Sequence, residues 1–580
     1  MQMPIRRRWI GGGMMAAIRQ VEVRRFRGVR EAIWAPLPGL NAIIGAGDTG
    51  KSTLLDAIEL ALAPRRNLTF SDADFWQLDV TEPVDIRVTI GDLPDALLDI
   101  DRYGVMHRGW HAATGVLSDE PGVGLEDVVT IRLTVDQDLE PRWSLYSDRA
   151  DADGTTREVP PAERKNLAPT RLGVYASHHL AWGNRSILNK LAEIPSGAGG
   201  ALADAARKAR AEFGTAALAQ VQDALDIVHA VAEKAGILGA LEATALLDAH
   251  GISFSGGTIA LHDKEGVPLR NLGVGSSRLL IAGLQAAAGE ASPFVIVDEV
   301  EHGLEPHRII RLLHTLGSKK ATPTRQVFLT THSAVVVREL SAAQIWRAAD
   351  DGSGQVIMTR TDGSVDSQKT FRACAEAFLA PQVVVCEGPT EIGLLRGMDM
   401  HRDESDLPTL AAHGAALADG NGDSMIARAC AFARLGYRTA LLRDCDKPFT
   451  TDQLEALTAA GVTQFHWDAG LSTEQALCLS LPDGEIEKLV RIAIEENSKD
   501  KVNNHLRVQS ATLDSDAFNT LIGFGTAERK HLGAAAKKGG WFKNVTLGER
   551  VGREILAPAL DRCTGTVPVI IGDLRAWAAA

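Results

Sequence analysis

The sequence GAGDTGKS at residues 45–52 constrains the fold of this chain more than any other feature. It matches the pattern GxxxxGK[ST]; an apolar segment, residues 41–44, precedes it and an amphipathic segment follows it. This context predicts a strand, a glycine turn whose N–H groups point at phosphate oxygens, and a helix whose positive end adds to the attraction. We expect the turn to bind ATP, with Lys51 on the β- and γ-phosphates and Ser52 on Mg²⁺. The predicted nucleotide-binding residues of this turn are Gly45, Gly47, Gly50, Lys51, Ser52 and Thr53.

Two later apolar segments end in residues that suit the hydrolysis of ATP. Residues 294–297, FVIV, run into Asp298 and Glu299. We expect Asp298 to bind Mg²⁺ through water, and Glu299 to position or deprotonate the water that attacks the γ-phosphate. A further strand, QVFLTTHS, ends at His332, which can touch the γ-phosphate or the attacking water. Either segment alone is compatible with an ordinary buried strand, but their order behind the phosphate loop favours an ATPase.

The length of the chain predicts more than one domain and an insertion within the ATPase. A chain of 580 residues is longer than one hydrophobic core can serve, so two or three domains are expected. The distance from Lys51 to Asp298 is too long for one compact lobe. Residues 186–250 are rich in alanine, with apolar residues at helical spacing, which predicts a helical insertion. Upstream, VDIRVTIGDL and DVVTIRLTVDQD alternate in the manner of antiparallel strands.

Carboxylates follow two apolar segments in the C-terminal half. The first segment, QVVVCEGPTE, predicts a strand that ends at Glu387 and turns into a helix whose first turn contains Glu391. The second, RTALLRDCDKP, predicts a strand that ends in Asp444 and Asp446, whose side chains project to the same face because they are two residues apart. We expect all four carboxylates to face one point beyond the carboxyl ends of these strands, where ligands bind in open α/β sheets.

Four oxygen ligands suit Mg²⁺ or Mn²⁺ better than metals that prefer thiolates. Two such ions can activate a water and stabilise the leaving oxygen when a phosphodiester is cut. The predicted reaction is therefore hydrolysis of the DNA backbone. The alternative for the two aspartates alone is a pair of solvated loop acids, which the paired EGPTE element disfavours.

The order of these motifs resembles the ABC ATPases, and within them the SMC-like branch that includes the OLD (overcoming lysogenization defect) nucleases. FRG at residues 26–28 resembles the N-terminal strand of that family, and GLEP at 303–306 resembles its D-loop. LGVGSSRLL, residues 272–280, stands at the signature position, where the resemblance implies that Gly275 contacts the γ-phosphate of ATP on a second subunit. It departs from LSGGQ, because glycine stands for serine at 273 and serine for glutamine at 276. Gln77 is a candidate for the Q-loop.

The C-terminal motifs resemble TOPRIM domains, in which EG…E is followed by DxD. LADGNGDS, residues 417–424, is similar to the glycine turn that those domains place after their second strand. The resemblance implies that Glu387, Asp444 and Asp446 are catalytic. It also implies a stabilising lysine in KKGGWFKN, for which we choose Lys543 over Lys538. The implied metal ligands of this domain are Glu387, Glu391, Asp444, Asp446 and Glu474, in addition to Ser52 in the ATPase.

The resemblance implies an α/β chain with an ABC ATPase in two lobes and a C-terminal TOPRIM domain. The expected boundaries are a disordered extension at 1–15, an N-terminal lobe at 16–185, the helical insertion at 186–250, a C-terminal lobe at 251–370 and the TOPRIM domain at 371–580. In the OLD family such an insertion dimerises the ATPase. The alternative, a helix packed on its own lobe, stays open.

Composition limits the compartment and the partners. Six cysteines without a CxxC pair fit reduced thiols in the cytoplasm, and no apolar run approaches the roughly 20 residues that a membrane helix needs. A net charge of −13 argues against a surface coated with phosphate-binding cations, although it leaves room for a local basic groove. We expect an ATP-regulated DNA endonuclease in antiviral defence or DNA repair, with DNA, a second copy of the chain or a higher homo-oligomer, and a helicase encoded nearby as partners. The alternative is a nucleotide-switched scaffold whose TOPRIM domain does not cut.

Overall fold

The computed structural model describes residues 16–64, 68–93, 97, 103–172, 208, 261–264, 266–287, 292–361, 363–519 and 524–580. The predicted extension at 1–15 lies outside the described residues, and so does the predicted helical insertion at 186–250, apart from Lys208.

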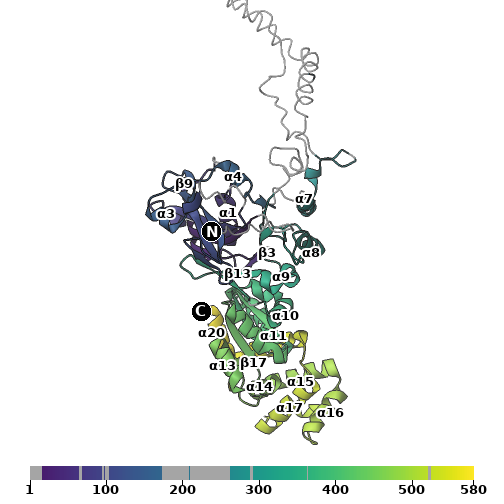
Figure 1. Ribbon diagram of the computed structural model, residues 1–580. Coiled ribbons are helices and arrows are strands. Elements are labelled where there is room, and N and C mark those ends of the chain that lie inside the picture. The colour runs from purple at the N-terminus through teal and green to yellow at the C-terminus, as the bar shows by residue number, and fades with distance from the viewer. Residues whose placement is uncertain are drawn as a thin grey trace, which may run out of the picture.

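A large mixed sheet forms the first part of the molecule (Figure 1). Its strands run in the order β10-β11-β12-β3-β13-β14-β2-β1-β4-β7-β5-β6, with β8 and β9 attached beside β7. The strands are β1 (Ala17–Phe26), β2 (Val29–Trp34), β3 (Leu40–Ile44), β4 (Val84–Gly91), β5 (His107–His111), β6 (Val116–Ser118), β7 (Glu126–Val135), β8 (Pro141–Tyr146), β9 (Arg157–Glu158), β10 (Thr170–Arg171), β11 (Phe294–Val297), β12 (Gln326–Thr330), β13 (Ile345–Asp350) and β14 (Gln355–Arg360).

The two ends of this sheet differ in strand direction. Strands β10, β11, β12, β3 and β13 are parallel neighbours, and the apolar runs of β3, β11 and β12 are buried throughout, as expected of strands covered on both faces. Strands β4 and β7 pair antiparallel, with Val84 opposite Val135, which confirms the prediction from their alternating sequences. Because parallel strands point the same way, β3, β11 and β12 end at one edge of the sheet.

The helices of the first part connect these strands. Helix α1 (Lys51–Ala61) follows β3 directly and buries Leu54, Leu55, Ala57 and Ile58, which share one face at helical spacing. The other helices are α3 (Asp148–Ala152), α4 (Pro161–Lys165), α7 (Val274–Ala287), α8 (Pro306–Thr315), α9 (Ala334–Glu339) and α10 (Val365–Ala373).

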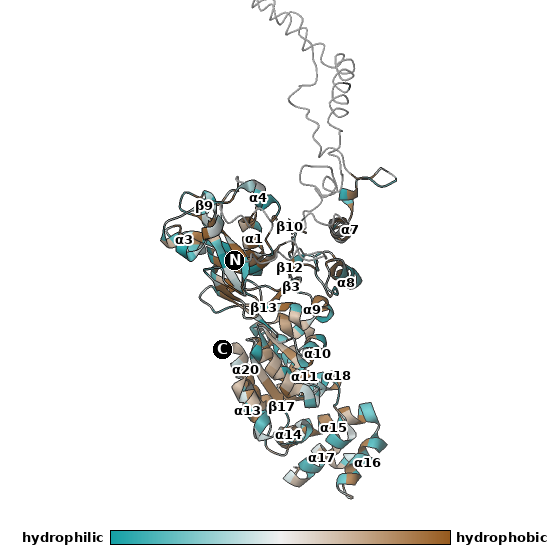
Figure 2. Ribbon diagram, in the orientation of Figure 1, coloured by the Kyte–Doolittle hydropathy of each residue, from teal (hydrophilic) through white to brown (hydrophobic). Residues whose placement is uncertain are grey.

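A second, smaller parallel sheet forms the C-terminal part, in the order β16-β15-β17-β18. Its strands are β15 (Gln382–Cys386), β16 (Ala415–Asp419), β17 (Arg438–Arg443) and β18 (Thr463–His466). Its helices are α11 (Pro389–Asp403), α12 (Met425–Arg434), α13 (Thr451–Ala459), α14 (Thr473–Ser480), α15 (Asp483–Asn497), α16 (Lys499–Gln509), α17 (Thr526–Gly539), α18 (Val545–Val551), α19 (Ala557–Ala559) and α20 (Val567–Ala579). Figure 2 shows the hydrophobic colour of β17 between helices and the more hydrophilic colour of α16 at the far end.

One hydrophobic core joins the two parts. Residues of the first sheet, such as Leu329, belong to the same buried cluster as Phe378 and Tyr437 of the second part. The Arg347 guanidinium of β13 lies 4.2 Å from the centre of the Tyr437 ring and donates a hydrogen bond to the carbonyl of Leu435 (3.2 Å). The second sheet is therefore packed directly on the first part of the molecule.

No single helix in the described ranges has the length and apolar character to cross a membrane. The segments Val545–Arg562 and Val567–Ala579 meet those criteria only together, as a pair bent by 103°. All six cysteines are free.

Candidate nucleotide site and carboxylate cluster

The phosphate loop has backbone angles that require glycine at two positions. Gly45 and Gly50 have φ values of +147° and +78°, which L side chains rarely adopt. A Cβ on Gly45 would lie 2.3 Å from the carbonyl oxygen of Ala348 on the neighbouring strand. Lys51 is buried at the start of α1, and its Nζ donates to the carbonyls of Gly45 (3.1 Å) and Ala46. Burial lowers the pKa of Lys51, although nearby Asp48, Asp298 and Glu299 oppose that effect.

The structure brings the predicted magnesium ligands of the ATPase together. Asp298 follows β11, and its Oδ1 accepts hydrogen bonds from Ser52 Oγ (3.0 Å) and from Thr330 Oγ1 at the end of β12 (2.6 Å). Glu299 has φ +45°, and its side chain is 59% exposed beside Asp298. His332 lies two residues beyond β12; it is exposed, and its N–H donates to Glu301 Oε1 (2.6 Å). The three predicted motifs therefore meet at one sheet edge, with Thr53 half-buried in the first turn of α1.

The signature segment packs against the D-loop. Helix α7 begins at Val274, and a Cβ on Gly275 would lie 2.2 Å from the carbonyl oxygen of Gly303, which itself has φ +71°. Gly275 therefore allows a close backbone approach within one chain. Its contact with ATP on a second subunit stays a prediction, and so does the Q-loop role of Gln77, which is exposed with φ +53°.

Two arginines that sequence reasoning missed stabilise this site. Arg171 Nη2 donates to Asp298 Oδ2 (3.1 Å), and its Nη1 donates to carboxylates of α1, Asp56 (2.5 Å) and Glu59 (2.7 Å). Arg278, buried on α7, donates to the carbonyls of Asp298 (3.0 Å) and Glu299 (3.0 Å). Arg278 stands inside the signature segment, and this position could have indicated its role. No sequence pattern around Arg171 indicates its contact with Asp298.

Glu387 and Asp444 meet at the carboxyl ends of neighbouring strands. Glu387 directly follows β15 and Asp444 directly follows β17, and these strands pair in parallel with Cys386 opposite Leu442. The backbone N–H of Asp444 donates to Glu387 Oε2 (2.9 Å). The predicted glycine turn follows β16, where the N–H of Gly422 donates to the carbonyl of Glu387 (2.9 Å). Sequence reasoning therefore placed these two carboxylates correctly.

The charges of Asp444 and Asp446 are unequal. Burial, together with the negative charges of Glu387 and Asp446, raises the pKa of Asp444 to about 8. Burial also works against ionisation of Asp446, but hydrogen bonds from Lys537 and Asp444 hold the pKa of Asp446 below its usual value. Lys537 forms an ion pair with Asp446 Oδ2.

Glu391 and Glu474 are buried and hydrogen-bonded, each only 5% exposed. Glu391 caps its own helix, because Oε2 accepts from the N–H of Gly388 (3.0 Å), while Oε1 accepts from Thr473 Oγ1. Glu474 Oε2 accepts from Ser472 Oγ (2.9 Å). Burial, reinforced by the charges of Glu387 and Glu474, raises the pKa of Glu391 to about 7. Both glutamates lie beside the cluster, but each accepts a hydrogen bond from another group of the protein.

The expected four-carboxylate cage is therefore not assembled. In the part of the chain that the structure describes, no three His, Cys, Asp or Glu residues form a group that could hold a metal ion. Other groups of the protein are the partners of two of these carboxylates: Glu391 accepts a hydrogen bond from Thr473 Oγ1, and Asp446 accepts one from Lys537 Nζ. The metal role of Glu387, Glu391, Asp444, Asp446 and Glu474 stays a prediction.

The lysine at the cluster is Lys537, rather than Lys543 or its competitor Lys538, which are both exposed. Helix α17 packs tightly on α14, because a Cβ on Gly533 would lie 2.6 Å from Gln475 Cα. Residues four apart share a helix face, so Lys537 points along the same side toward the start of α14. No local pattern singles out Lys537, because a small residue also stands four positions before Lys538 and before Lys543.

Comparisons with known proteins support the ATPase. A family model described as "AAA domain, putative AbiEii toxin, Type IV TA system" matches residues 40–338. No curated protein matches the chain. Such a P-loop domain binds ATP and implies its hydrolysis.

Among solved structures, the matches include heads of Smc proteins. One is the SmcHead bound to the C-winged helix domain of ScpA, with 13% identity and a TM-score of 0.34 over 60% of this chain and 98% of that one. A second is the Smc head domain with an extended coiled coil bound to the C-terminal domain of ScpA, from Pyrococcus furiosus, with 16% identity and a TM-score of 0.34 over 60% and 97% of the two chains. A third is the SMC head domain from Thermotoga maritima, with 12% identity and a TM-score of 0.28 over 60% and 99%. Likenesses with TM-scores this low do not assign a function to the chain. Since the family model spans more than half of the sequence and contains the phosphate loop, Asp298 and His332, this chain belongs to the family of AAA domains described as putative AbiEii toxins of type IV TA systems.

Proposed function

We propose that this chain is an ATP-regulated, divalent-metal-dependent DNA endonuclease of the OLD type, with a TOPRIM domain as its cutting centre. One observation supports this proposal most strongly: Asp444 and Glu387 are joined at the ends of adjacent parallel strands, with Asp446 and Lys537 beside them. The sheet order β16-β15-β17-β18 puts both carboxylates on the two central strands. Such a place, beyond the carboxyl ends of strands in an open sheet, is where ligands bind.

The donor chemistry of the cluster fits Mg²⁺ or Mn²⁺, because all its acidic ligands are hard oxygens. Glu387, Asp444 and Asp446 would hold the ion, since they are only half-buried, whereas Glu391 and Glu474 are buried. Glu391 and Glu474 could join only by releasing Thr473 and Ser472. When bound, such ions activate water and stabilise the leaving oxygen of a cut phosphodiester.

The residues of the chain itself orient the substrate. Burial, together with the charges of Glu387 and Asp446, raises the pKa of Asp444, and a bound cation would offset both effects. Lys537, at the rim of the cluster, supplies an ammonium that can contact a phosphate of DNA.

The ATPase would control cutting through a dimer or a higher homo-oligomer. The signature segment leaves Leu272 and Val274 exposed beside Gly275, which suits a contact with a second copy. The family description names a toxin of a toxin–antitoxin system, which supports a role in defence. A cytoplasmic location and a helicase encoded nearby belong to the same proposal.

Nicking of supercoiled plasmid in Mg²⁺ or Mn²⁺ tests the proposal. Asp444→Asn keeps the size of the side chain and removes the charge, so nicking should fall at least about 100-fold. Asp452→Asn, at an exposed position of α13, is the matched control and should cut like the parent. Equal cutting by Asp444→Asn and the parent would exclude this cluster as the nuclease centre.

A second candidate is a nucleotide-switched scaffold whose C-terminal part does not cut. The observation in its favour is that, among the described residues, no group of three potential ligands is arranged for a metal, and that Lys537 already neutralises Asp446. This candidate predicts ATP-dependent assembly that Asp444→Asn leaves intact, with no nicking by the parent protein in either metal.

A further inference from the structure

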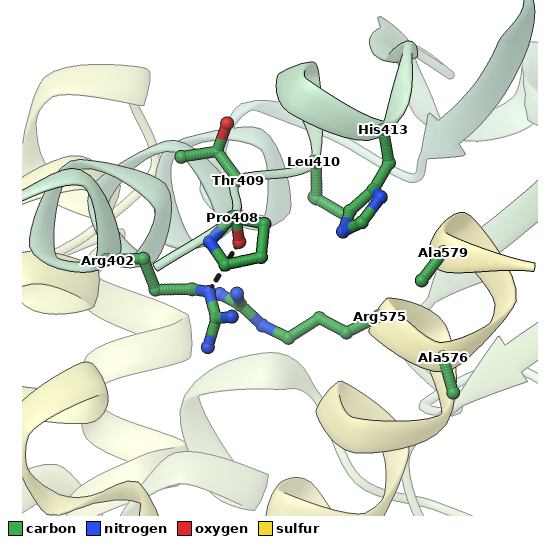
Figure 3. Close-up of a pocket in the computed structure, with 8 residues that line it drawn as sticks. All are labelled: Arg402, Pro408, Thr409, Leu410, His413, Arg575, Ala576 and Ala579. Carbon is green, nitrogen blue, oxygen red and sulfur yellow. Dashed lines mark hydrogen bonds between the residues drawn. The ribbon is translucent and has the colours of Figure 1, made fainter. Parts of the chain in front are cut away.

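A cavity of about 340 Å³ lies at the opposite end of helix α11 from the carboxylate cluster (Figure 3). Glu391 stands in the first turn of α11 and Arg402 in the last, which separates them by about 16 Å at 1.5 Å per residue. Arg575 enters the cavity from α20, and His413 enters from the short helix η11 (Ala411–His413) that precedes β16. The cavity is therefore a site separate from the proposed nuclease centre.

The cavity has more positive than negative charge. Arg402 and Arg575 both line it, and the charge of Arg402 acts on the guanidinium group of Arg575 (Figure 3). The carboxylate that pairs with Arg575 is Asp399. That pair is long, with 3.7 Å between Arg575 Nη2 and Asp399 Oδ1, and the other oxygen of Asp399 accepts from the N–H of Leu410 (2.9 Å). Nε and Nη2 of Arg575 are buried and have no hydrogen-bond partner.

Helix capping explains one of these arginines but not the other. Arginine in the last turn of a helix is favoured by the helix dipole, and Arg402 Nε also donates to the carbonyl of Pro408 (2.8 Å). Arg575 is only 16% exposed, and buried donors are almost always satisfied in proteins. Burial and the neighbouring charge of Arg402 lower the pKa of Arg575 to about 10, although the charge of Asp399 opposes that effect.

We propose that this cavity binds the phosphate group of a small organic phosphate, of the size of a mononucleotide. Two guanidinium forks match the oxygens of a phosphate, and they are the usual choice for its recognition. Pro408, Leu410 and Ala576 supply an apolar wall for the organic part, and the volume lies in the range of small-molecule sites. A DNA strand fits less well, because Arg575 is recessed and little of it reaches the surface. This site goes beyond the proposed nuclease and does not depend on it.

Calorimetric titration of the full-length protein with AMP tests the site, with inorganic phosphate and a single-stranded oligonucleotide as further probes. All variants carry Lys51→Ala, so that binding at the phosphate loop is weakened equally. We expect saturable binding of AMP that is at least about 10-fold weaker in Arg575→Met and in Arg402→Met, as for a lost charged hydrogen bond. Arg507→Met, at an exposed position of α16, should bind like the parent.

The thermal unfolding curve of each variant shows whether it is folded. Because Arg402 is only half-buried, Arg402→Met tests the site even if Arg575→Met unfolds. Weaker binding of phosphate than of AMP would support the role of the apolar wall. Three results would overturn the proposal: no saturable binding of AMP or phosphate, equal affinity in the parent and both variants, or arginine-dependent binding of the oligonucleotide alone. Nicking and ATP hydrolysis play no part in this readout.

Discussion

The nucleotide site and the carboxylate cluster are both built at the ends of parallel strands, but different groups line them. At the nucleotide site, backbone groups of the loop and the contact between Ser52 and Asp298 form as soon as β3, β11 and α1 pack. At the cluster, the like charges of the carboxylates repel one another. Lys537 forms an ion pair with Asp446, and Thr473 donates a hydrogen bond to Glu391. The fold alone fixes the position of backbone N–H groups, whereas the charges of grouped carboxylates also depend on the cations beside them.

Replacing Lys51 tests the separation of the two regions and should give the largest effect. In Lys51→Ala the phosphates of ATP lose their ammonium, so ATP hydrolysis should fall at least about 100-fold in a phosphate-release assay. Binding of Mn²⁺ by the C-terminal cluster should not change, because no cluster residue contacts Lys51 among the described residues. A simultaneous loss of cluster binding would mean that the two regions are one coupled site.

Replacing Lys537 tests which lysine of the segment acts at the cluster. We expect Lys537→Met to lower plasmid nicking by about 10- to 100-fold, since the variant loses the positive charge beside Asp446. Lys543→Met and Lys538→Met remove exposed ammonium groups of the same segment and should change nicking by less than about 3-fold. If Lys543→Met is instead the inactive variant, the contact seen for Lys537 is not the functional one.

The pH dependence of stability provides the smallest expected effect. The folded state holds the proton of Glu391 up to about pH 7, whereas the unfolded state releases it near 4.5, so stability falls as the pH rises between these values. Asp444, with its pKa raised from 3.8 to about 8, acts in the same direction over a wider range. In chelator, Glu391→Gln should reduce this loss by about 1 kcal/mol, measured by thermal unfolding across the window. An unchanged slope would mean that Glu391 is ionised in the folded protein.

Local motifs and strand direction were sufficient to predict the phosphate loop and the meeting of Glu387 with Asp444. The phosphate loop lies within eight consecutive residues, 45–52, and its turn geometry follows from Gly45 and Gly50. The meeting of Glu387 with Asp444 follows from two buried apolar runs, because such runs form parallel strands whose carboxyl ends share an edge.

Contacts between distant helices and loops could not be predicted in this way. Arg171 reaches Asp298 across 127 residues of sequence, and no local pattern specifies that pairing. Lys537 was missed because its direction depends on the close packing of α17 on α14 at Gly533. Glu391 was assigned as a ligand although its place in the first helical turn also suits a capping role, and the structure gives it that role.

Direct titration of Mn²⁺ is the most decisive measurement for the cluster. Electron paramagnetic resonance of the free ion counts bound Mn²⁺ in the Lys51→Ala protein without nucleotide, and Asp444→Asn in the same background is compared with it. We expect the Lys51→Ala protein to bind Mn²⁺, and we expect the added Asp444→Asn substitution to abolish this binding at the same free concentration of Mn²⁺. Equal Mn²⁺ binding by the two proteins, or none by either, would contradict the assignment of Glu387, Asp444 and Asp446 as a metal site.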